Sequence, residues 1–447
     1  MAISRREALT LSSLAVASSA ISGCSSSKNP KPETKTKSTN DYKAPIADSK
    51  NPRVVVVGGG WSGLSIAKYT KIFAPHSDVI LVEQRYEFVS CPVSNLWLVD
   101  KVELEYLTHD YLQAARENNY TFFHAAAVGI DKKNRILKTS DGDIQYDYLV
   151  FSPGIDYDYS RWTKDIAFET RLRQEYPAGF ISGSEHITLK NKIKNFKGGN
   201  FILTVPSGNY RCLPAPYERA CIIADYFKQN KLNAKVILLD ENNTITIKEK
   251  GFQSAFDELY ADYLEYHPGS VIHKIDLDNK MVHTEFDEFE FEDAAFYPHV
   301  RGAKILERVG FAKDAKNKLE ANINPLTYEI IGEKNIFAAG DCRPMGFSKS
   351  GNTSNSEGHH VAELVAQKIN KTAEVAWEPP TTTCFSAVSI APERAIYIYT
   401  QYSYSKTDKT FDFAGTVSSE DWKRDGIVNA DSLYDWADTL YSDMFDS

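Results

Sequence analysis

The sequence predicts an α/β protein with two Rossmann-like domains and a small α+β domain at its C-terminal end. Two stretches, residues 53–83 and 198–239, each combine an apolar run, a turn, a helical segment and a second apolar run. This is the pattern of a βαβ unit. The segment from Pro379-Pro380 to the end is instead rich in Tyr, Trp and Asp, and we expect it to form a separate small domain.

Composition and charge limit the classes of function. The chain has 447 residues, of which 42% are hydrophobic and 25% are charged, which is ordinary for a protein of two or three globular domains. The net charge of −9 argues against binding to nucleic acid, whose phosphates attract a basic surface. No stretch after residue 25 approaches the roughly 20 apolar residues of a membrane-spanning helix, so we expect no membrane span.

The first 24 residues read as an export signal. Arg5-Arg6 precede an apolar run, Ala8–Ile21, that resembles a twin-arginine signal, which exports proteins already folded around a cofactor. An ordinary secretory signal is the alternative. The end of the run, ISGC, resembles a bacterial lipobox, which would make Cys24 a lipid anchor; a cleavage site with a chance Cys is the alternative. Residues 25–50 have few apolar side chains and predict a flexible linker, so we expect a periplasmic protein.

A glycine-rich turn follows the first predicted strand. The strand, residues 53–57, leads into GGGWSG, then a helix over 64–73 and a second strand over 79–82. Gly58, Gly60 and Gly63 would let the backbone approach a pyrophosphate at the start of the helix. Glu83, at the end of the second strand, can accept hydrogen bonds from a ribose. This order of elements predicts a dinucleotide-binding domain.

Two later segments indicate that the dinucleotide is FAD. Residues 146–154, YDYLVFSPG, are similar to the strand and turn that leave the FAD domain of flavoproteins with two dinucleotide-binding domains. Residues 335–341, NIFAAGD, are similar to their second FAD motif, in which a strand ends at Gly340-Asp341 and the carboxylate binds a ribitol hydroxyl. A helix predicted over 358–370 would point its N-terminus at the flavin. We therefore expect a disulfide-reductase-like fold with an FAD-binding domain over 51–155 and 296–375, a second Rossmann-like domain over 156–295, and a flavin-capping domain over 376–447.

The second domain lacks a nicotinamide-binding motif. In NAD(P)H-using relatives a glycine-rich loop follows the first strand, but here the turn is PSGNYRCLP, residues 206–214. Its prolines have no backbone N–H to offer a phosphate. We expect the electrons to come from a source other than NAD(P)H.

Six cysteines stand at positions 24, 91, 212, 221, 342 and 384, and none forms a C-x-x-C pair. This spacing disfavours zinc, the ten histidines show no ligand pattern, and we expect no metal site. The chain has no C-x-x-C-H motif and so attaches no c-type haem itself. We expect Cys221 and Cys342 to be free and buried, with a bond between them as the alternative.

Four segments resemble those of a known family. They are FVSCPVSN at 88–95, YRCLPAPYERA at 210–220, KSGNTSNS at 349–356 and TCFS at 383–386. They resemble the flavoprotein subunit of flavocytochrome c sulfide dehydrogenase. The resemblance implies that the chain oxidises sulfide and passes electrons singly to a c-type cytochrome subunit. It also implies that a thioether joins the FAD covalently to Cys91, for which a buried free cysteine is the alternative.

The same resemblance gives roles to residues that are far apart in the chain. Cys212 and Cys384 correspond to a redox-active disulfide that hydrosulfide can open by thiol exchange; a structural disulfide is the alternative. Glu218 corresponds to an acidic residue that could take a proton, although the dipole of a helix also favours a Glu in its first turn. Trp436 corresponds to a tryptophan on the flavin, although it also fits the apolar face of a terminal helix.

Two other functions stay open. A sulfide:quinone reductase would need a quinone channel and membrane-binding C-terminal helices, whereas residues 421–447 are acidic and aromatic. A non-catalytic flavoprotein that assists a sulfur-oxidation complex could use the same flavin and disulfide. Leu213, Ala215 and residues 296–301 depart from the family pattern, and these changes could shift the substrate to another sulfur nucleophile.

Overall fold

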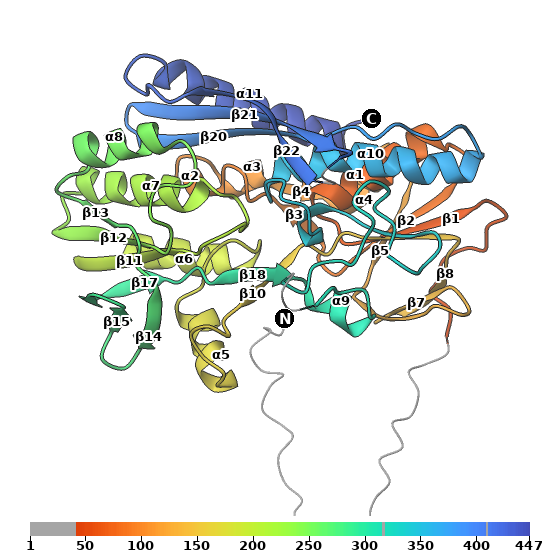
Figure 1. Cartoon of the computed structure of the whole chain (residues 1–447), viewed down its shortest axis with the longest axis horizontal. Helices are drawn as coiled ribbons and strands as arrows, with labels where there is room; N and C mark the ends of the chain where they lie inside the picture. The colour runs from red at the N-terminus through yellow and green to blue at the C-terminus, as the bar shows by residue number, and fades with distance from the viewer. Residues whose placement is uncertain (1–41, 315–317, 408–409) are drawn as a thin grey trace, which may run out of the picture. The chain divides into compact units, whose positions relative to one another are not determined.

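The computed structural model describes residues 42–314, 318–407 and 410–447. The predicted signal peptide, Cys24 and most of the predicted linker lie outside these residues. The described chain is organised around two parallel sheets and one antiparallel sheet, each with helices packed on it (Figure 1). This arrangement confirms the predicted fold class.

The first sheet has five parallel strands in the order β19-β9-β1-β2-β5. At its centre, β1 (Arg53–Val57) buries all of its valines, because neighbouring strands and helices surround it. The other strands are β2 (Asp78–Glu83), β5 (Thr121–His124), β9 (Tyr148–Phe151) and β19 (Ile336–Ala338). Since the strands are parallel, the turns that follow β1, β9 and β19 meet at one edge of the sheet.

Two long helices pack along each other beside this sheet. They are α1 (Trp61–Phe73) and α10 (Gly351–Asn370). A Cβ atom at Gly358 would lie 2.7 Å from the Cβ of Ser65, so a larger residue would force the helices apart. Their close packing brings the start of α10 to the same sheet edge as the start of α1.

The second sheet has the order β13-β12-β11-β17, again with parallel strands. Its strands are β11 (Gly199–Val205), β12 (Ala234–Asp240), β13 (Leu264–His267) and β17 (Asp293–Ala295). The helix α7 (Ala215–Gln229) follows β11 and packs on this sheet. Two antiparallel strands, β10 (Ile155–Asp158) and β18 (His299–Gly302), connect the two domains.

The C-terminal domain is a three-stranded antiparallel sheet covered by one helix. Its strands are β20 (Thr381–Ile390), β21 (Glu393–Ser405) and β22 (Thr410–Ser419), and its helix is α11 (Gly426–Phe445). β20 contacts α7 of the second domain and α10 of the first, and Figure 1 shows the domain lying across both. This contact carries residues of β20 to the place where the two Rossmann-like domains meet.

Shorter elements complete the described chain. They are β3 (Glu87–Val89), α2 (Ser94–Trp97), α3 (Leu104–Leu107), β4 (Thr108–Asp110), α4 (Tyr111–Glu117), β6 (Ala127–Asp131), β7 (Ile136–Thr139), β8 (Gly142–Gln145), α5 (Ile166–Glu175), α6 (Ser184–Asn195), α8 (Glu249–Leu259), β14 (Ile272–Asp276), β15 (Met281–Thr284), β16 (Glu288–Glu290), α9 (Lys304–Arg308) and the 3₁₀ turn η2 (Gly340–Cys342).

The largest error in the predicted elements concerns α10, which begins at Gly351 rather than at residue 358. The added turns have the sequence GNTSNSE, whose residues have low helix propensity. The helix starts there because the hydroxyl of Ser350 accepts a hydrogen bond from the backbone N–H of Thr353, which is an N-cap. The helix α7 begins at Ala215, so Glu218 lies within its first turn.

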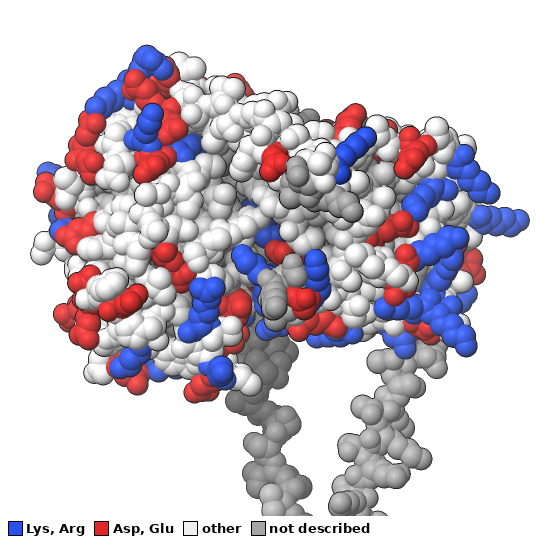
Figure 2. All heavy atoms as spheres, viewed as in Figure 1, with Lys and Arg blue, Asp and Glu red and all other residues white. Residues whose placement is uncertain are grey.

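Charge is spread unevenly over the described surface. Figure 2 shows Lys and Arg side chains gathered at the edge of the first domain near β7, whereas the area over α7 carries few charges. No helix in the described part of the chain is both long and apolar enough to cross a membrane.

Candidate functional site

A cavity of about 490 Å³ lies where the three domains meet. Almost all of the site residues predicted from the sequence line it, although they are spread over the whole chain: Gly58, Gly60, Glu83, Cys91, Cys212, Glu218, Gly340, Asp341, Cys384 and Trp436. The exception is Gly63, which packs behind the cavity wall. The cavity is therefore the candidate site.

The glycine loop forms one end of the cavity. Gly58 has φ +102°, and a Cβ at Gly63 would lie 1.8 Å from the carbonyl oxygen of Gly58, so both positions exclude a side chain. At Gly60 a Cβ would meet no protein atom within 4 Å, so the backbone there faces open space. The start of α1 has no side-chain cap and no acidic residue in its first turn, which leaves its N–H groups free to bind an anion.

Glu83 fixes this loop. One carboxylate oxygen accepts a hydrogen bond from the N–H of Gly59 at 2.8 Å, and the other accepts one from the N–H of Arg85 at 2.9 Å. Each carboxylate oxygen has a second acceptor position, and Glu83 lines the cavity. The residue therefore holds the loop and can still accept a hydrogen bond from a ribose, which stays a prediction.

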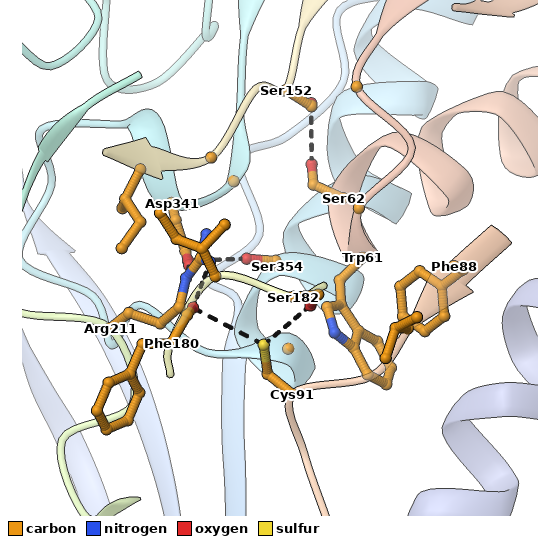
Figure 3. Close-up of a pocket in the computed structure, with 18 of the residues that line it drawn as sticks. Trp61, Ser62, Phe88, Cys91, Ser152, Phe180, Ser182, Arg211, Asp341 and Ser354 are labelled. Carbon is orange, nitrogen blue, oxygen red and sulfur yellow. Dashed lines mark hydrogen bonds and ion pairs between the residues drawn. The ribbon is translucent and has the colours of Figure 1, made fainter. Parts of the chain in front are cut away.

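Asp341 lies at the start of η2, within a polar cluster. One oxygen accepts a hydrogen bond from Nε of Arg211 at 2.7 Å, and the other accepts one from the hydroxyl of Ser354 at 3.1 Å (Figure 3). The preceding residue, Gly340, donates its N–H to the carboxylate of Glu357 at 2.8 Å. These contacts hold the carboxylate of Asp341 at the cavity wall.

Cys91 follows β3 and directs its sulfur into the cavity. Its Sγ lies 3.2 Å from the hydroxyl of Ser182 and 3.8 Å from the carbonyl oxygen of Phe180. Figure 3 shows the rings of Trp61 and Phe88 to one side of this sulfur and Arg211 to the other. A planar ring in the cavity would thus have a thiol within reach of its edge.

Cys212 and Cys384 meet in the cavity, although 172 positions separate them in the sequence. Both are free thiols in this structure, and their side chains form a hydrogen bond with each other. This bond, with burial, raises the pKa of the Cys212 thiol. The same bond, with the nearby Lys248, lowers the pKa of the Cys384 thiol. The pair is therefore asymmetric, and the negative charge is favoured on Cys384.

Glu218 projects from the first turn of α7 toward the two cysteines. Its Oε1 accepts a hydrogen bond from the N–H of Ala387 at 2.9 Å, and its Oε2 accepts one from Nδ2 of Asn95 at 2.9 Å. The loss of surrounding water raises the pKa of its carboxyl to about 7. A carboxyl with this pKa can both take and return a proton near neutral pH.

Trp436 belongs to α11 and lines the cavity beside Phe385, with 5.8 Å between their ring centroids. Its indole N–H is buried and has no hydrogen-bond partner in the described structure. A buried N–H without a partner is costly, so this atom is a candidate donor to a bound group. The structure places Trp436 at the cavity wall, and its contact with a flavin stays a prediction.

Comparisons with known proteins place the chain in a family. The family model described as "Sulfide dehydrogenase [flavocytochrome c] flavoprotein chain, central" matches residues 187–295. A second family model, for the flavin-binding domain of flavocytochrome c sulphide dehydrogenase, matches residues 378–445. A third, pyridine nucleotide-disulphide oxidoreductase, matches residues 52–160. The sulfide dehydrogenase flavoprotein chain of Chlorobaculum thiosulfatiphilum is 56% identical over 43 residues, which are 10% of this chain and 90% of that sequence. The chain belongs to the family of flavocytochrome c sulfide dehydrogenase flavoprotein chains.

More distant relatives share the fold of this family. The mitochondrial sulfide:quinone oxidoreductase of Schizosaccharomyces pombe is 23% identical over 333 residues, which cover 68% of this chain and 71% of that protein. The structure of the sulfide:quinone oxidoreductase of Aquifex aeolicus has a TM-score of 0.70 at 14% identity and covers 88% of this chain and 91% of that chain. The likeness confirms the disulfide-reductase-like fold.

The cavity fits the FAD that this family implies. The free N–H groups at the start of α1 and the open space at Gly60 suit a pyrophosphate. At the other end, the unpartnered indole N–H of Trp436 and the sulfur of Cys91 face the space that a ring system would fill. Asp341 lies between the two ends, where it can accept a hydrogen bond from a sugar hydroxyl.

Four residues that the family match alone did not single out complete the site. Arg211 binds Asp341, and Arg219 is buried, where it donates hydrogen bonds to the carbonyls of Ala178 and Gly179 at 2.6 and 2.7 Å. Arg211 directly precedes the predicted site residue Cys212, and Arg219 directly follows Glu218. Their positions in the sequence could therefore have identified them as site residues. Asn95 ends the family segment at 88–95, but its contact with Glu218 depends on the fold. Lys248 reaches the site only through the fold, and nothing in its local sequence marks it.

The remaining predictions about cysteines and histidines have mixed outcomes. Cys221 and Cys342 are free and buried, as predicted. In the described residues, no three or more His, Cys, Asp or Glu side chains gather in a group that could hold a metal ion, and the absence of a metal site stays a prediction. The helix predicted over 358–370 would have His359 and His360 at its start, which is wrong because α10 begins at Gly351. His359 contacts Asp443 of α11 at 2.9 Å.

Proposed function

We propose that this chain oxidises sulfide through a disulfide between Cys212 and Cys384 and delivers the electrons, through an FAD bonded to Cys91, to a c-type cytochrome. The observation that carries the proposal is the convergence of both cysteines and Glu218 in the cavity that fits the flavin. A structural disulfide would need neither a carboxyl beside it nor a place in a cofactor cavity.

The proposed step is a thiol–disulfide exchange. Hydrosulfide gives an electron pair to one sulfur of the disulfide, the S–S bond breaks, and the other cysteine leaves as a thiolate. The attacked cysteine becomes a persulfide, and the carboxylate of Glu218 can take the proton that the incoming sulfur releases. When a second hydrosulfide takes up the outer sulfur of the persulfide and the disulfide forms again, the hydrosulfide that was oxidised has yielded one sulfur atom at the zero oxidation level, one proton and two electrons.

A bound FAD would supply the two-electron acceptor for this exchange and pass the electrons on one at a time. A c-type haem takes one electron, so each sulfide that is oxidised reduces two haems. The family to which the chain belongs supports a cytochrome as the acceptor, since its description names a flavocytochrome c. The export signal and the lipid anchor at Cys24 belong to the same proposal, because a periplasmic site would give access to such a cytochrome.

Steady-state turnover tests this function. The purified flavoprotein, at catalytic concentration, is mixed with sulfide and either an oxidised c-type cytochrome or a soluble ubiquinone analogue. The proposal predicts continued reduction of the cytochrome. Reduction of the quinone alone would favour a sulfide:quinone reductase. Reduction of the flavin without turnover on either acceptor would favour an accessory flavoprotein.

A further inference from the structure

Lys248 is a buried cation without a carboxylate partner. It precedes α8 in the left-handed region of backbone conformation, with φ 55°, and only 4% of its surface is exposed. It forms no salt bridge with any carboxylate in the described part of the chain. Because burying an ammonium group is costly unless a negative charge or hydrogen bonds compensate it, its position calls for a specific partner.

The ammonium group of Lys248 is directed at β20. Its Nζ donates to the hydroxyl of Ser386 at 2.7 Å and to the backbone carbonyl of Cys384 at 3.2 Å. Side chains two positions apart lie on the same face of a strand, and the hydroxyl of Ser386 also favours the thiolate of Cys384 by hydrogen bonding. The ammonium, the hydroxyl and the sulfur therefore form a short polar connection.

Two other groups act on the pKa of Cys212 through their negative charge. They are Glu218, which raises the pKa of Cys212 by its charge, and Cys91, which acts in the same direction. Burial keeps Glu218 partly protonated near neutral pH, since its pKa is about 7. The charge of Lys248 also lowers the pKa of Glu218, but the hydrogen bonds of its ammonium group run to Ser386 and to the backbone of Cys384.

We propose that Lys248 is a positioning residue that keeps the negative charge of the opened sulfur pair on Cys384, with Ser386 as the connecting hydroxyl. The proposal deepens the proposed function and rests on it. It states which of the two cysteines is deprotonated: in the reduced protein Cys384 is the thiolate, and Cys212 keeps its proton.

A pH titration of the reduced protein tests this assignment without sulfide turnover. The ultraviolet absorbance of thiolate is followed anaerobically in the wild type and in K248M, which keeps the length of the side chain and removes its charge. The exposed neighbour Lys250 provides the matched control, K250M. We expect the midpoint to rise by about one pH unit in K248M, a tenfold loss of thiolate at a given pH, to rise less in S386A, and to be unchanged in K250M.

Two further variants complete the test. The thiolate signal should disappear in C384S, and K248R should restore part of the shift because it keeps the charge. An unchanged midpoint in both K248M and S386A, or a signal that disappears in C212S but persists in C384S, would overturn the proposal. If K248M does not fold, S386A gives the same test. Failure of sulfide turnover with these titration results intact would count against the proposed function alone.

Discussion

Glu218 and Ala387 are joined by a hydrogen bond of 2.9 Å from the backbone N–H of Ala387 to Oε1 of Glu218. The bond connects α7 of the second domain to β20 of the C-terminal domain, three residues beyond Cys384. It fixes an ionisable carboxyl beside the sulfur pair, and the same burial that makes this contact raises the pKa of that carboxyl to about 7. Proton transfer and sulfur exchange are therefore expected to depend on one another.

Replacing Glu218 by glutamine tests this dependence. The carboxylate form accepts the proton, so the contribution of Glu218 to the rate should increase as pH rises through about 7. In E218Q we expect flavin reduction by sulfide to slow by roughly 100-fold, which is typical for the loss of a general base. Stopped-flow measurement of both proteins across pH 5–9 checks this, because their ratio cancels the ionisation of sulfide. A constant ratio would mean that Glu218 is structural.

The proposed thioether between FAD and Cys91 predicts how the flavin behaves when the protein unfolds. We expect acid-denatured wild-type protein to keep its yellow colour in the precipitate, and mass spectrometry to place the added flavin mass on the peptide that contains Cys91. C91A should release its flavin into the supernatant. Release of the flavin from the wild type would contradict a covalent bond, although the cavity would still bind the cofactor non-covalently.

Arg211 provides a prediction about stability. Its Nε lies 2.7 Å from Oδ2 of Asp341, and both groups are largely buried. R211M would leave the carboxylate without its cation, and we expect the free energy of unfolding to fall by about 3 kcal/mol, measured by urea denaturation. The exposed pair Arg171–Glu175 is the control, since R171M should change this free energy by less than about 1 kcal/mol. Equal losses of unfolding free energy in R211M and R171M would show that the buried pair stabilises the protein no more than the exposed pair does.

The glycine loop allows two contrasting substitutions. G63A places a Cβ 1.8 Å from the carbonyl oxygen of Gly58, so it should lower the thermal midpoint of the protein as well as its flavin content. G60A meets no protein atom, so it should lower flavin content with little change in the midpoint of the flavin-free protein. Absorbance ratios and thermal denaturation separate the two. Full flavin content in G60A would argue that the pyrophosphate does not approach Gly60.

The sequence predicted those parts of the fold and site in which local pattern and chemistry coincide. The site begins where three predicted strands end: at Gly58, at Glu83 and at the Gly340-Asp341 turn. At these positions the local sequence pattern already identifies the residues that form the site. By contrast, the start of α10 at Gly351 depends on a cap by Ser350 and on packing against α1, which overrides the low helix propensity of the segment.

The contacts between domains could not be predicted from the local sequence. Lys248 precedes α8 in a charged stretch whose sequence is typical of a solvent-exposed segment. In the fold it is buried against β20, where it contacts Cys384, a residue 136 positions away in the sequence. Asn95 likewise reaches Glu218 across 123 positions. Only the family resemblance related Cys212 to Cys384, and the structure then placed them side by side.

The most direct measurement of the central claim is an anaerobic titration of the flavin spectrum with sulfide in wild-type protein, C212S and C384S. The account predicts that sulfide bleaches the flavin of the wild type with about one equivalent, and that neither variant is bleached although both contain flavin. Bleaching of the flavin in C212S and C384S at the wild-type rate, or none in the wild type, would contradict oxidation of sulfide through this pair of cysteines.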